Sequence, residues 1–250
     1  MTSKFLAFVA NANHKAAESM LRGTPSLAIT YGDLIDPAGR LFGGITGFQY
    51  AVWALDWHMW KMIQKYLYSA DVKHQLRQYN SRNTQWLSEH GNSAAPIIQN
   101  LISALKSFED LCKSFEYTAA NEFWNKQVGG AQKLIPMHVV NEYFLPERTF
   151  ELCLNFSVVE ILPHVWETEN CEMYSVKHSQ NSKNCAENLG KSFAYVRASL
   201  QSPAVSHGKL NIIFKIENRA SGVTADLNAC FDLLSSRLSQ KENLFREVLD

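Results

Sequence analysis

The stretch that decides the fold is "ITGFQYAVWALDWHMWKMIQKYL", residues 45–67. Apolar residues recur in it at steps of three and four, which is the spacing of one helical face. Thr46 is placed to cap the start of a helix, because its hydroxyl can accept a hydrogen bond from a backbone amide. The pattern predicts either one long helix or two short helices bent near Asp56 and Trp57.

The same stretch carries three tryptophans that a helix would place on one flank: Trp53, Trp57 and Trp60. Burial of a large aromatic side chain stabilises a fold by about 1.5–3 kcal/mol, so packing alone can justify all three. A helix that is apolar almost all round is usually central to its core, and this is the favoured interpretation. The alternative is an exposed aromatic groove, in which these tryptophans are the binding residues.

The composition is that of a folded protein. Of the 250 residues, 46% are apolar and 19% are charged, and 24 basic residues balance 24 acidic ones. Because the formal net charge is zero and the basic residues are dispersed, we predict no nucleic-acid partner. The cysteines are odd in number, scattered and without a CxxC pair, which argues against a disulfide framework and fits a reducing compartment.

The first residues, "MTSKFLAFVANANHKAA", imitate a signal peptide. Their apolar run, Phe5–Ala10, is shorter than the roughly 7–15 residues of a cleaved signal, so we expect a buried strand or helix turn here instead. No run approaches the roughly 18 apolar residues of a membrane span. The sequence therefore predicts a soluble protein without a cleaved signal peptide.

The fold class indicated by the rest of the chain is mainly α (α+β), with a few short strands in the C-terminal half. The clearest helix is "SAAPIIQNLISALKSFEDLCKSF", residues 93–115, which Ser93 can cap. Earlier in the chain, a short helix from residue 14 should end at Gly23-Thr24-Pro25. A turn should follow at Asp36–Gly39, where proline fixes φ and glycine can take a positive φ.

The absence of a low-complexity linker favours one domain over residues 1–250, with a polar insertion near 167–190. Its expected parts are a helical segment (33–67), a helical core (93–144), a mixed region (145–216) and a C-terminal helix (222–249).

A second stretch with polar groups in apolar surroundings is "WNKQVGGAQKLIPMHVVNEYF", residues 124–144. Gly129-Gly130 predicts a break before the next helix, and Gln132 beside it is a candidate binding residue. His138 and Glu142 are four apart on a helix and could share a proton or a metal ion, which makes them weak catalytic candidates. There is no second histidine at the spacing of a zinc hydrolase, so a buried histidine satisfied by glutamate is the favoured interpretation.

Cys171, His178 and Cys185 stand at equal spacing in a polar segment, where a surface loop is expected. The spacing matches no zinc pattern, even with His164 as a ligand from elsewhere, and we predict no metal and no cofactor. Cysteines and histidines from distant parts of the chain could still converge into a nucleophilic pair.

Three stretches resemble segments of known proteins: residues 33–67 ("DLIDPAGRLFGGITGFQYAVWALDWHMWKMIQKYL"), 124–150 ("WNKQVGGAQKLIPMHVVNEYFLPERTF") and 189–200 ("LGKSFAYVRASL"). They are similar, in the same order, to segments of the Legionella-type (Dot/Icm) secreted effectors of intracellular bacteria. Residues 33–67 also resemble a degenerate ankyrin unit, a turn followed by a helix pair, although no second copy stands at the roughly 33-residue ankyrin period.

The resemblance implies a virulence protein secreted by a bacterium into the cytoplasm of a eukaryotic host cell, where it acts on a host protein, membrane or signalling step. Because the net charge is zero and no catalytic motif is present, we expect it to act by binding a host protein. The resemblance supplies no catalytic residues. The aromatic helix at Trp53–Trp60 and the Gly129–Tyr143 segment are then candidates for its scaffold and rim. Two alternatives remain open: a Cys/His hydrolase or transferase that modifies a host protein, with His138 as its histidine, and a phosphoinositide-headgroup binder with a basic pocket from Lys126, Lys133 and Arg148.

Overall fold

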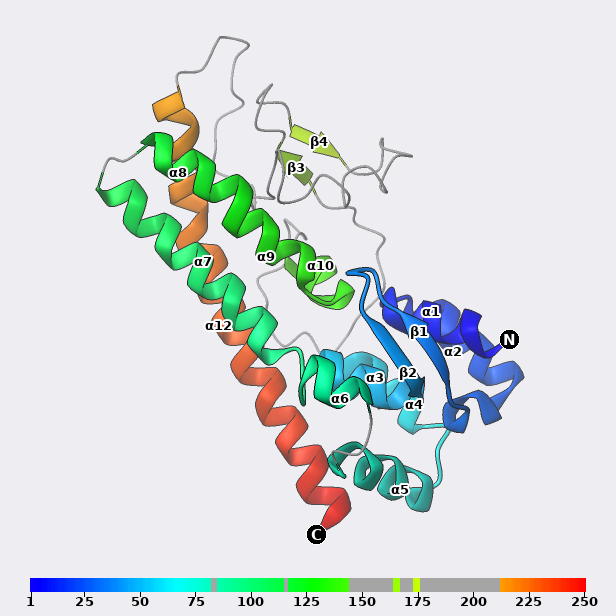
Figure 1. Ribbon diagram of the computed structural model, residues 1–250. Coiled ribbons are helices and arrows are strands. Elements are labelled where there is room, and N and C mark those ends of the chain that lie inside the picture. The colour runs from blue at the N-terminus through cyan, green and yellow to red at the C-terminus, as the bar shows by residue number, and fades with distance from the viewer. Residues whose placement is uncertain (82–84, 115–116, 144–163, 167–172, 176–211) are drawn as a thin grey trace. The chain divides into compact units, whose positions relative to one another are not determined.

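The computed structural model describes residues 1–81, 85–114, 117–143, 164–166, 173–175 and 212–250 (Figure 1). The chain divides into two compact units, and each is described by itself. The first consists of Met1–Pro96, Pro136–His138 and Leu234–Asp250, and the second of Ile97–Ile135 and Val139–Leu233. The organisation of residues 1–250 as a single domain stays a prediction.

The first unit packs short helices around one β-hairpin. Its elements are α1 (Thr2–Ala10), α2 (His14–Gly23), the 3₁₀ helix η1 (Pro25–Ile29), β1 (Gly32–Ile35), β2 (Leu41–Ile45), α3 (Gly47–Ala54), α4 (Trp57–Gln64), α5 (Ser69–Asn80) and α6 (Gln85–His90). Helix α1 contacts β1, α2 and α3, and α6 contacts β2. Figure 1 shows the hairpin running beside α1.

The predicted punctuation before residue 45 is confirmed. Helix α2 ends at Gly23, and Gly39 takes a φ of 83° in the turn that follows Asp36. The apolar start of the chain adopts the helical alternative, in α1. The strands around the turn were not part of the prediction, because β1 and β2 are short and β2 contains two glycines.

Residues 45–67 form two helices, as one of the two predicted alternatives had it. Thr46 caps α3 through a capping box with Gln49, which confirms its predicted role. Helix α3 ends where Leu55 adopts a left-handed conformation with a φ of 64°. Asp56 then starts α4 by accepting a hydrogen bond from the amide of Met59, 3.0 Å away. The bend predicted near Asp56 is this interruption.

The core of the first unit is aromatic. Its fully buried large side chains include Phe5, Phe42, Phe48, Tyr50, Trp53, Trp60 and Trp86. Trp53 and Trp60 are both 0% exposed, which confirms the core interpretation for these two residues. Helices α1 and α3 approach so closely that a Cβ atom on Gly47 would lie 2.7 Å from the Phe5 ring. A larger residue at position 47 would therefore force the two helices apart.

The second unit contains helices and one small two-stranded sheet. Its elements are α7 (Ala95–Lys113), α8 (Tyr117–Phe123), the π-helix η2 (Trp124–Val128), α9 (Gly129–Leu134), α10 (Met137–Tyr143), β3 (His164–Trp166), β4 (Met173–Ser175) and α12 (Ile212–Leu249). The first residues of α7 and α10 and the last part of α12 belong to the first unit. The helix predicted over residues 93–115 is confirmed as α7, and its Phe108 packs on Trp124 with ring centroids 4.7 Å apart.

The break predicted at Gly129-Gly130 is wrong. Val128 and Gly129 have helical backbone angles, and the chain passes from η2 directly into α9. The π-helix accommodates an additional residue without interrupting the helical chain. Glycine inside a helix weakens it but does not have to end it. The restart after Pro136 is confirmed, because Ile135 is extended and α10 begins at Met137.

The fold class, mainly α with few strands, is confirmed, and β3 and β4 lie in the C-terminal half as predicted. The C-terminal helix begins at Ile212 rather than at residue 222. Residues 33–67 hold the hairpin and the pair α3 and α4, and their likeness to ankyrin stays a prediction. In the described part of the chain, no helix combines the length and apolarity needed to cross a bilayer.

Candidate functional site

The β1–β2 hairpin has one buried and one exposed face. Leu34 pairs with Phe42, and both point into the core. The next pair, Ile35 and Leu41, faces outward, with Ile35 69% and Leu41 54% exposed. Because paired residues in an antiparallel ladder project on the same side, the two form a contiguous apolar patch, which we call the outer pair.

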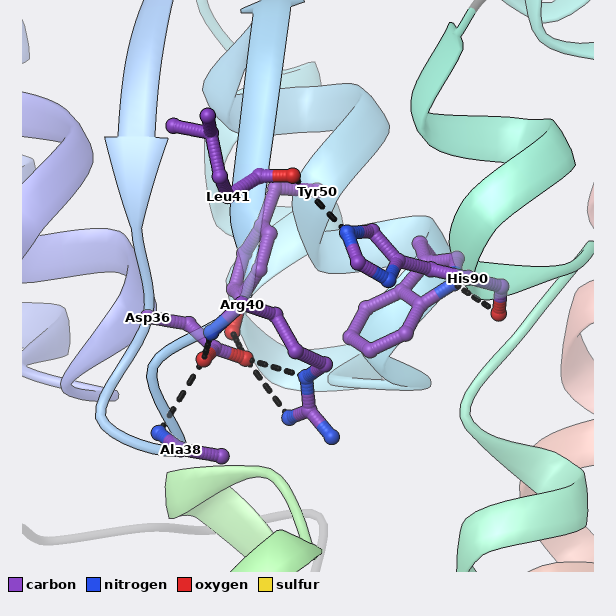
Figure 2. Close-up of polar contacts among 7 residues, drawn as sticks. Asp36, Ala38, Arg40, Leu41, Tyr50 and His90 are labelled. Carbon is purple, nitrogen blue, oxygen red and sulfur yellow. Dashed lines mark hydrogen bonds and ion pairs between the residues drawn. The ribbon is translucent and has the colours of Figure 1, made fainter.

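A polar network fixes the turn that carries the outer pair (Figure 2). The Oδ1 atom of Asp36 accepts hydrogen bonds from the amides of Ala38 and Arg40, at 3.0 and 2.9 Å. Its Oδ2 atom accepts from the Arg40 guanidinium, with the Nε atom at 2.8 Å. The Tyr50 hydroxyl donates to the same oxygen at 3.4 Å. Burial, together with the charge of Asp36, raises the pKa of Tyr50 well above its usual value, so the phenol keeps its proton.

Aromatic rings pack against this network. The Arg40 guanidinium lies over the Trp53 ring, 5.0 Å from its centroid, and Phe42 packs edge-on against the same ring at 4.7 Å. Figure 2 shows His90 reaching β2, where its Nε2 atom lies 2.8 Å from the carbonyl oxygen of Leu41. The backbone under the outer pair is therefore held by α3 and α6 as well as by the strand ladder.

A second polar group lies at the interruption between α3 and α4. Asp56 is buried there and contacts His14 of α2, with 3.2 Å between its Oδ1 atom and the Nε2 atom of His14. The His58 ring packs edge-on against that of His14, 6.3 Å away. His138 and Arg237 are close enough for their charges to interact with this group. We call these five residues the histidine cluster.

Burial sets the protonation states within the histidine cluster. Desolvation, with a further contribution from the charge of Arg237, lowers the pKa of both His58 and His138 to about 4, although the charge of Asp56 acts in the opposite direction. Desolvation by itself would raise the pKa of Asp56, but the imidazoles of His14 and His138 and the bond from Met59 together lower it. At neutral pH the cluster therefore holds an ionised aspartate next to neutral His58 and His138.

The space beside the cluster is small and closely lined. Its lining residues are Val9, Ala10, Ala12, Tyr50, Ala51, Ala54, Asp56, Pro136, Met137 and His138. Most of these residues are apolar and fill the space, so Asp56 and His138 lie in a packed interior. No cysteine belongs to this lining, which is drawn from the described residues alone.

The structure separates the residues that the sequence nominated for binding. Trp53 and Trp60 have no exposed surface, whereas Trp57 is half-buried and its ring lies 4.9 Å from that of His58. Gln132 is buried in α9 of the second unit. Of the four, only Trp57 therefore exposes part of its side chain to solvent.

The catalytic candidates fare differently from each other. His138 is buried, as favoured, and its interaction partners within the first unit are Asp56, Arg237, His14 and the backbone of Leu55. Glu142 lies in α10, and its side chain is outside the described residues. Cys171, His178, Cys185 and Arg148 also lie outside them, as does the side chain of His164. In the described part of the chain, no three His, Cys, Asp or Glu side chains are grouped as metal ligands would be.

Two features escaped the sequence-based prediction. The outer pair depends on the register of two short strands, which β-propensity did not reveal. The pairing of Asp56 with His14 joins residues 42 positions apart in sequence, and no local motif marks it. The turn signal at Asp36–Gly39 was the available hint for the hairpin, since apolar residues on both sides of such a turn are typical of paired strands.

The chain is similar to a protein family and to one of its curated relatives. A family model described as the CBUA0006 C-terminal domain matches residues 100–248. A protein of Coxiella burnetii (strain RSA 493 / Nine Mile phase I), described as "Uncharacterized protein CBUA0006", is 29% identical over 171 residues. The alignment covers 60% of this chain and 50% of that relative, so the chain spans about half the length of the curated relative it matches.

No solved structure matches the chain significantly. The hairpin and the helices up to α6 precede the residues that the family model matches, whereas His138 and Arg237 lie within them. Because the model covers more than half of the 250 residues, the chain belongs to the CBUA0006 C-terminal domain family.

Proposed function

We propose that this chain is a bacterial effector that acts in the cytoplasm of a eukaryotic host cell by binding a host protein through the outer face of the β1–β2 hairpin. Two lines support the effector role: the resemblance of three stretches to Legionella-type effectors, and a relative in Coxiella burnetii. The binding role is supported by the contrast between an exposed apolar pair on the hairpin and a packed interior around His138.

The outer pair is the observation that carries the proposal. Ile35 and Leu41 stand side by side, both more than half exposed, on a strand pair whose opposite face is buried. Large apolar side chains gain about 25 cal/mol for each Å² that a partner covers. Their exposure on adjacent positions therefore favours a protein contact at this point.

The rigidity of the hairpin makes this contact efficient. The Asp36–Arg40 ion pair and the bond between His90 and Leu41 hold the backbone in place before any partner arrives. On the same face, the Oδ1 atom of Asp33 accepts a hydrogen bond from the amide of Gly44 across the strands, at 2.9 Å. A preorganised surface loses less conformational entropy on binding, so more of the contact energy appears as affinity.

The geometry fits a partner with a flat apolar surface. Gly43 and Gly44 carry no side chains beside the outer pair. A Cβ atom added to Gly44 would meet no neighbouring atom within 4 Å, and one added to Gly43 would lie 3.9 Å from the Oδ1 atom of Asp33. The open strip next to Leu41 would let a partner's side chain lie along β2. We expect the partner to contribute aliphatic or aromatic side chains at this position.

The binding surface can be tested with charged substitutions. The full-length chain is used as bait in eukaryotic cell lysate, a captured protein is identified by mass spectrometry, and that protein is purified for affinity measurement. In the Ile35→Lys/Leu41→Lys double variant we expect at least a tenfold loss of affinity, because two buried contacts would become charged. Circular dichroism should show an unchanged fold, since neither side chain packs in the core.

Tyr68→Lys provides the matched control, because Tyr68 is another apolar residue of the first unit and is 83% exposed. It should bind the purified partner as the wild type does. Equal affinity of the folded double variant and the wild type would contradict the assignment of the outer face. A loss of affinity in the Tyr68→Lys variant of the same size would contradict it too, because any added charge would then be enough.

Delivery into the host cell needs a separate test. The chain is fused to a reporter enzyme that is active only in eukaryotic cytoplasm and is expressed in a bacterium with a Dot/Icm-type secretion system. We expect reporter activity in infected host cells, and none from the same bacterium with the secretion system inactivated. Reporter activity that stays at background in both strains would contradict the effector role without touching the binding surface.

A further inference from the structure

The histidine cluster joins four separate segments of the first unit at one buried point. Its members are His14 from α2, Asp56 and His58 from the start of α4, His138 from the start of α10 and Arg237 from α12. The charge of Asp56 also helps to raise the pKa of Tyr50 in α3. These are the titratable and charged groups that face one another here, and the outer face of the hairpin does not include any of them.

Hydrogen bonding fixes the tautomer of His138. Its Nε2 atom is buried and has no hydrogen-bond partner among the described residues. The ring also bonds to the backbone of Leu55, and this bond favours the protonated imidazole. The donor is therefore Nδ1–H and the acceptor is the Leu55 carbonyl, which leaves Nε2 as the unprotonated nitrogen of the neutral ring.

Protonation of His138 would create two unfavourable groups at once. The new proton on Nε2 would be a buried donor without an acceptor in the described part of the chain. The new positive charge would also be removed from water, and this desolvation is the largest effect that opposes it; Asp56 attracts the charge, whereas Arg237 and His14 repel it. Both effects disappear if His138 moves into water.

We propose that the histidine cluster is an acid-sensitive latch, in which protonation of His138 releases the Pro136–His138 segment from the interruption between α3 and α4. At neutral pH the neutral ring closes the latch by its bond to Leu55. In acid the solvated imidazolium is the better state, and the segment detaches while the aromatic core beneath α3 stays packed.

Two residues beside the latch have a left-handed backbone conformation that is uncommon for residues other than glycine. Among the described residues other than glycine, a positive φ occurs only at Ala12, at 53°, and at Leu55, at 64°. Ala12 lines the space next to His138, and Leu55 is its hydrogen-bond partner. Strained residues persist only where the surroundings hold them, so loss of the His138 bond removes one of the contacts that hold Leu55.

The size of the effect follows from linkage. The pKa of His138 is lowered from the model-peptide value of 6.5 to about 4 in the closed state. A solvated ring binds protons more readily, so opening becomes more favourable as the pH falls from 6.5 toward 4. Between pH 7 and pH 5 the opening equilibrium should rise roughly 20-fold from His138 alone.

Hydrogen exchange measured by mass spectrometry tests the latch in the full chain. After correction for intrinsic exchange, the peptide covering 135–141 should lose roughly 20-fold protection between pH 7 and pH 5. The loss should be insensitive to low concentrations of urea, which marks a local opening. The peptide covering α3 should stay better protected at both pH values. A His138→Gln variant, whose amide can still donate to Leu55, should lose the pH response.

His74→Gln is the matched control, because it removes an exposed histidine of the same unit and should leave the response intact. If His138→Gln does not fold, Arg237→Gln takes its place and should reduce the response, since the opposing charge is removed. Protection of residues 135–141 that stays constant between the two pH values would overturn the latch. So would equal exchange of this peptide and the α3 peptide, which would indicate global unfolding.

Discussion

Two buried aspartates of the first unit illustrate two ways of keeping a carboxylate inside a protein. Asp36, at the hairpin turn, is paired with Arg40 and capped by two backbone amides. Asp56, between α3 and α4, is paired with His14 and interacts with His138. Both are almost completely buried, but Asp36 is paired with a guanidinium, whereas the partners of Asp56 are imidazoles, which exist in a charged and a neutral form.

The difference separates a rigid site from a responsive one. A guanidinium stays charged throughout the physiological range, so the ion pair that fixes the hairpin turn persists at every such pH. The His138 imidazole is neutral while it is buried and binds a proton more readily in water, so its contact near Asp56 weakens as the pH falls. The arrangement suits a binding surface that must stay preorganised and a separate segment that can move.

The largest expected effect comes from removing the support of the hairpin. Trp53→Ala should lower the free energy of unfolding by about 3–5 kcal/mol, because a fully buried indole under Arg40 leaves a cavity. Trp57→Ala should cost much less, about 1 kcal/mol, because Trp57 is only half-buried. Urea denaturation at pH 7 measures the free energy of unfolding of both variants. Equal losses would show that Trp57 contributes to the core as much as Trp53 does.

The next effect concerns the ion pair itself. Arg40→Ala should lower the free energy of unfolding by about 2–3 kcal/mol, because the buried carboxylate of Asp36 loses its partner. Arg40→Lys should lose less, since the charge is kept but the forked geometry is not. Urea denaturation at pH 7 measures both costs. Equal stability of the Arg40→Ala variant and the wild type would mean that the pair does not fix the turn.

The smallest effect is a pH dependence confined to the histidine cluster. Since the folded-state pKa of His138 is lowered to about 4, its contribution to stability is present above the model-peptide value of 6.5 and is lost as the pH falls toward 4. Between pH 7 and pH 5 this loss should be about 2 kcal/mol. The lowered pKa of Asp56 adds nothing in this range, because that carboxylate stays ionised.

His138→Gln should flatten this profile, apart from a smaller slope left by His58, which is less buried than His138. Thermal or urea unfolding of wild type and variant at a series of pH values provides the comparison. Parallel profiles for the two proteins would show that His138 is not the group responsible.

Local signals in the sequence predicted much of this architecture. Thr46 indicated the start of α3 by its capping hydroxyl, and residues 93–115 were predicted as the helix that forms α7. His138 was singled out as a polar residue in apolar surroundings. The predicted break at Gly129-Gly130 was wrong, because glycine lowers the stability of a helix but can remain inside one when the turns on both sides are formed.

The candidate site was harder to predict than the helices. Ile35 and Leu41 are exposed because they pair across a turn on the outer face of the hairpin. Aliphatic residues of this kind are typical of buried strands, so the sequence did not reveal their exposure. The partner of His138 was sought four residues away at Glu142, whereas Asp56, which interacts with it, stands 82 positions earlier in the numbering. Contacts between distant segments leave no periodic trace in a single sequence.

The most direct test of the account is photo-crosslinking from the outer face inside host cells. The photoreactive residue p-benzoylphenylalanine is placed at position 35, at position 41 or, as a control, at position 68, and the chain is produced in eukaryotic cells. Illumination should give an adduct with the same host protein from positions 35 and 41 and none from position 68. No adduct from either hairpin position, or the same adducts from all three, would contradict binding through the hairpin.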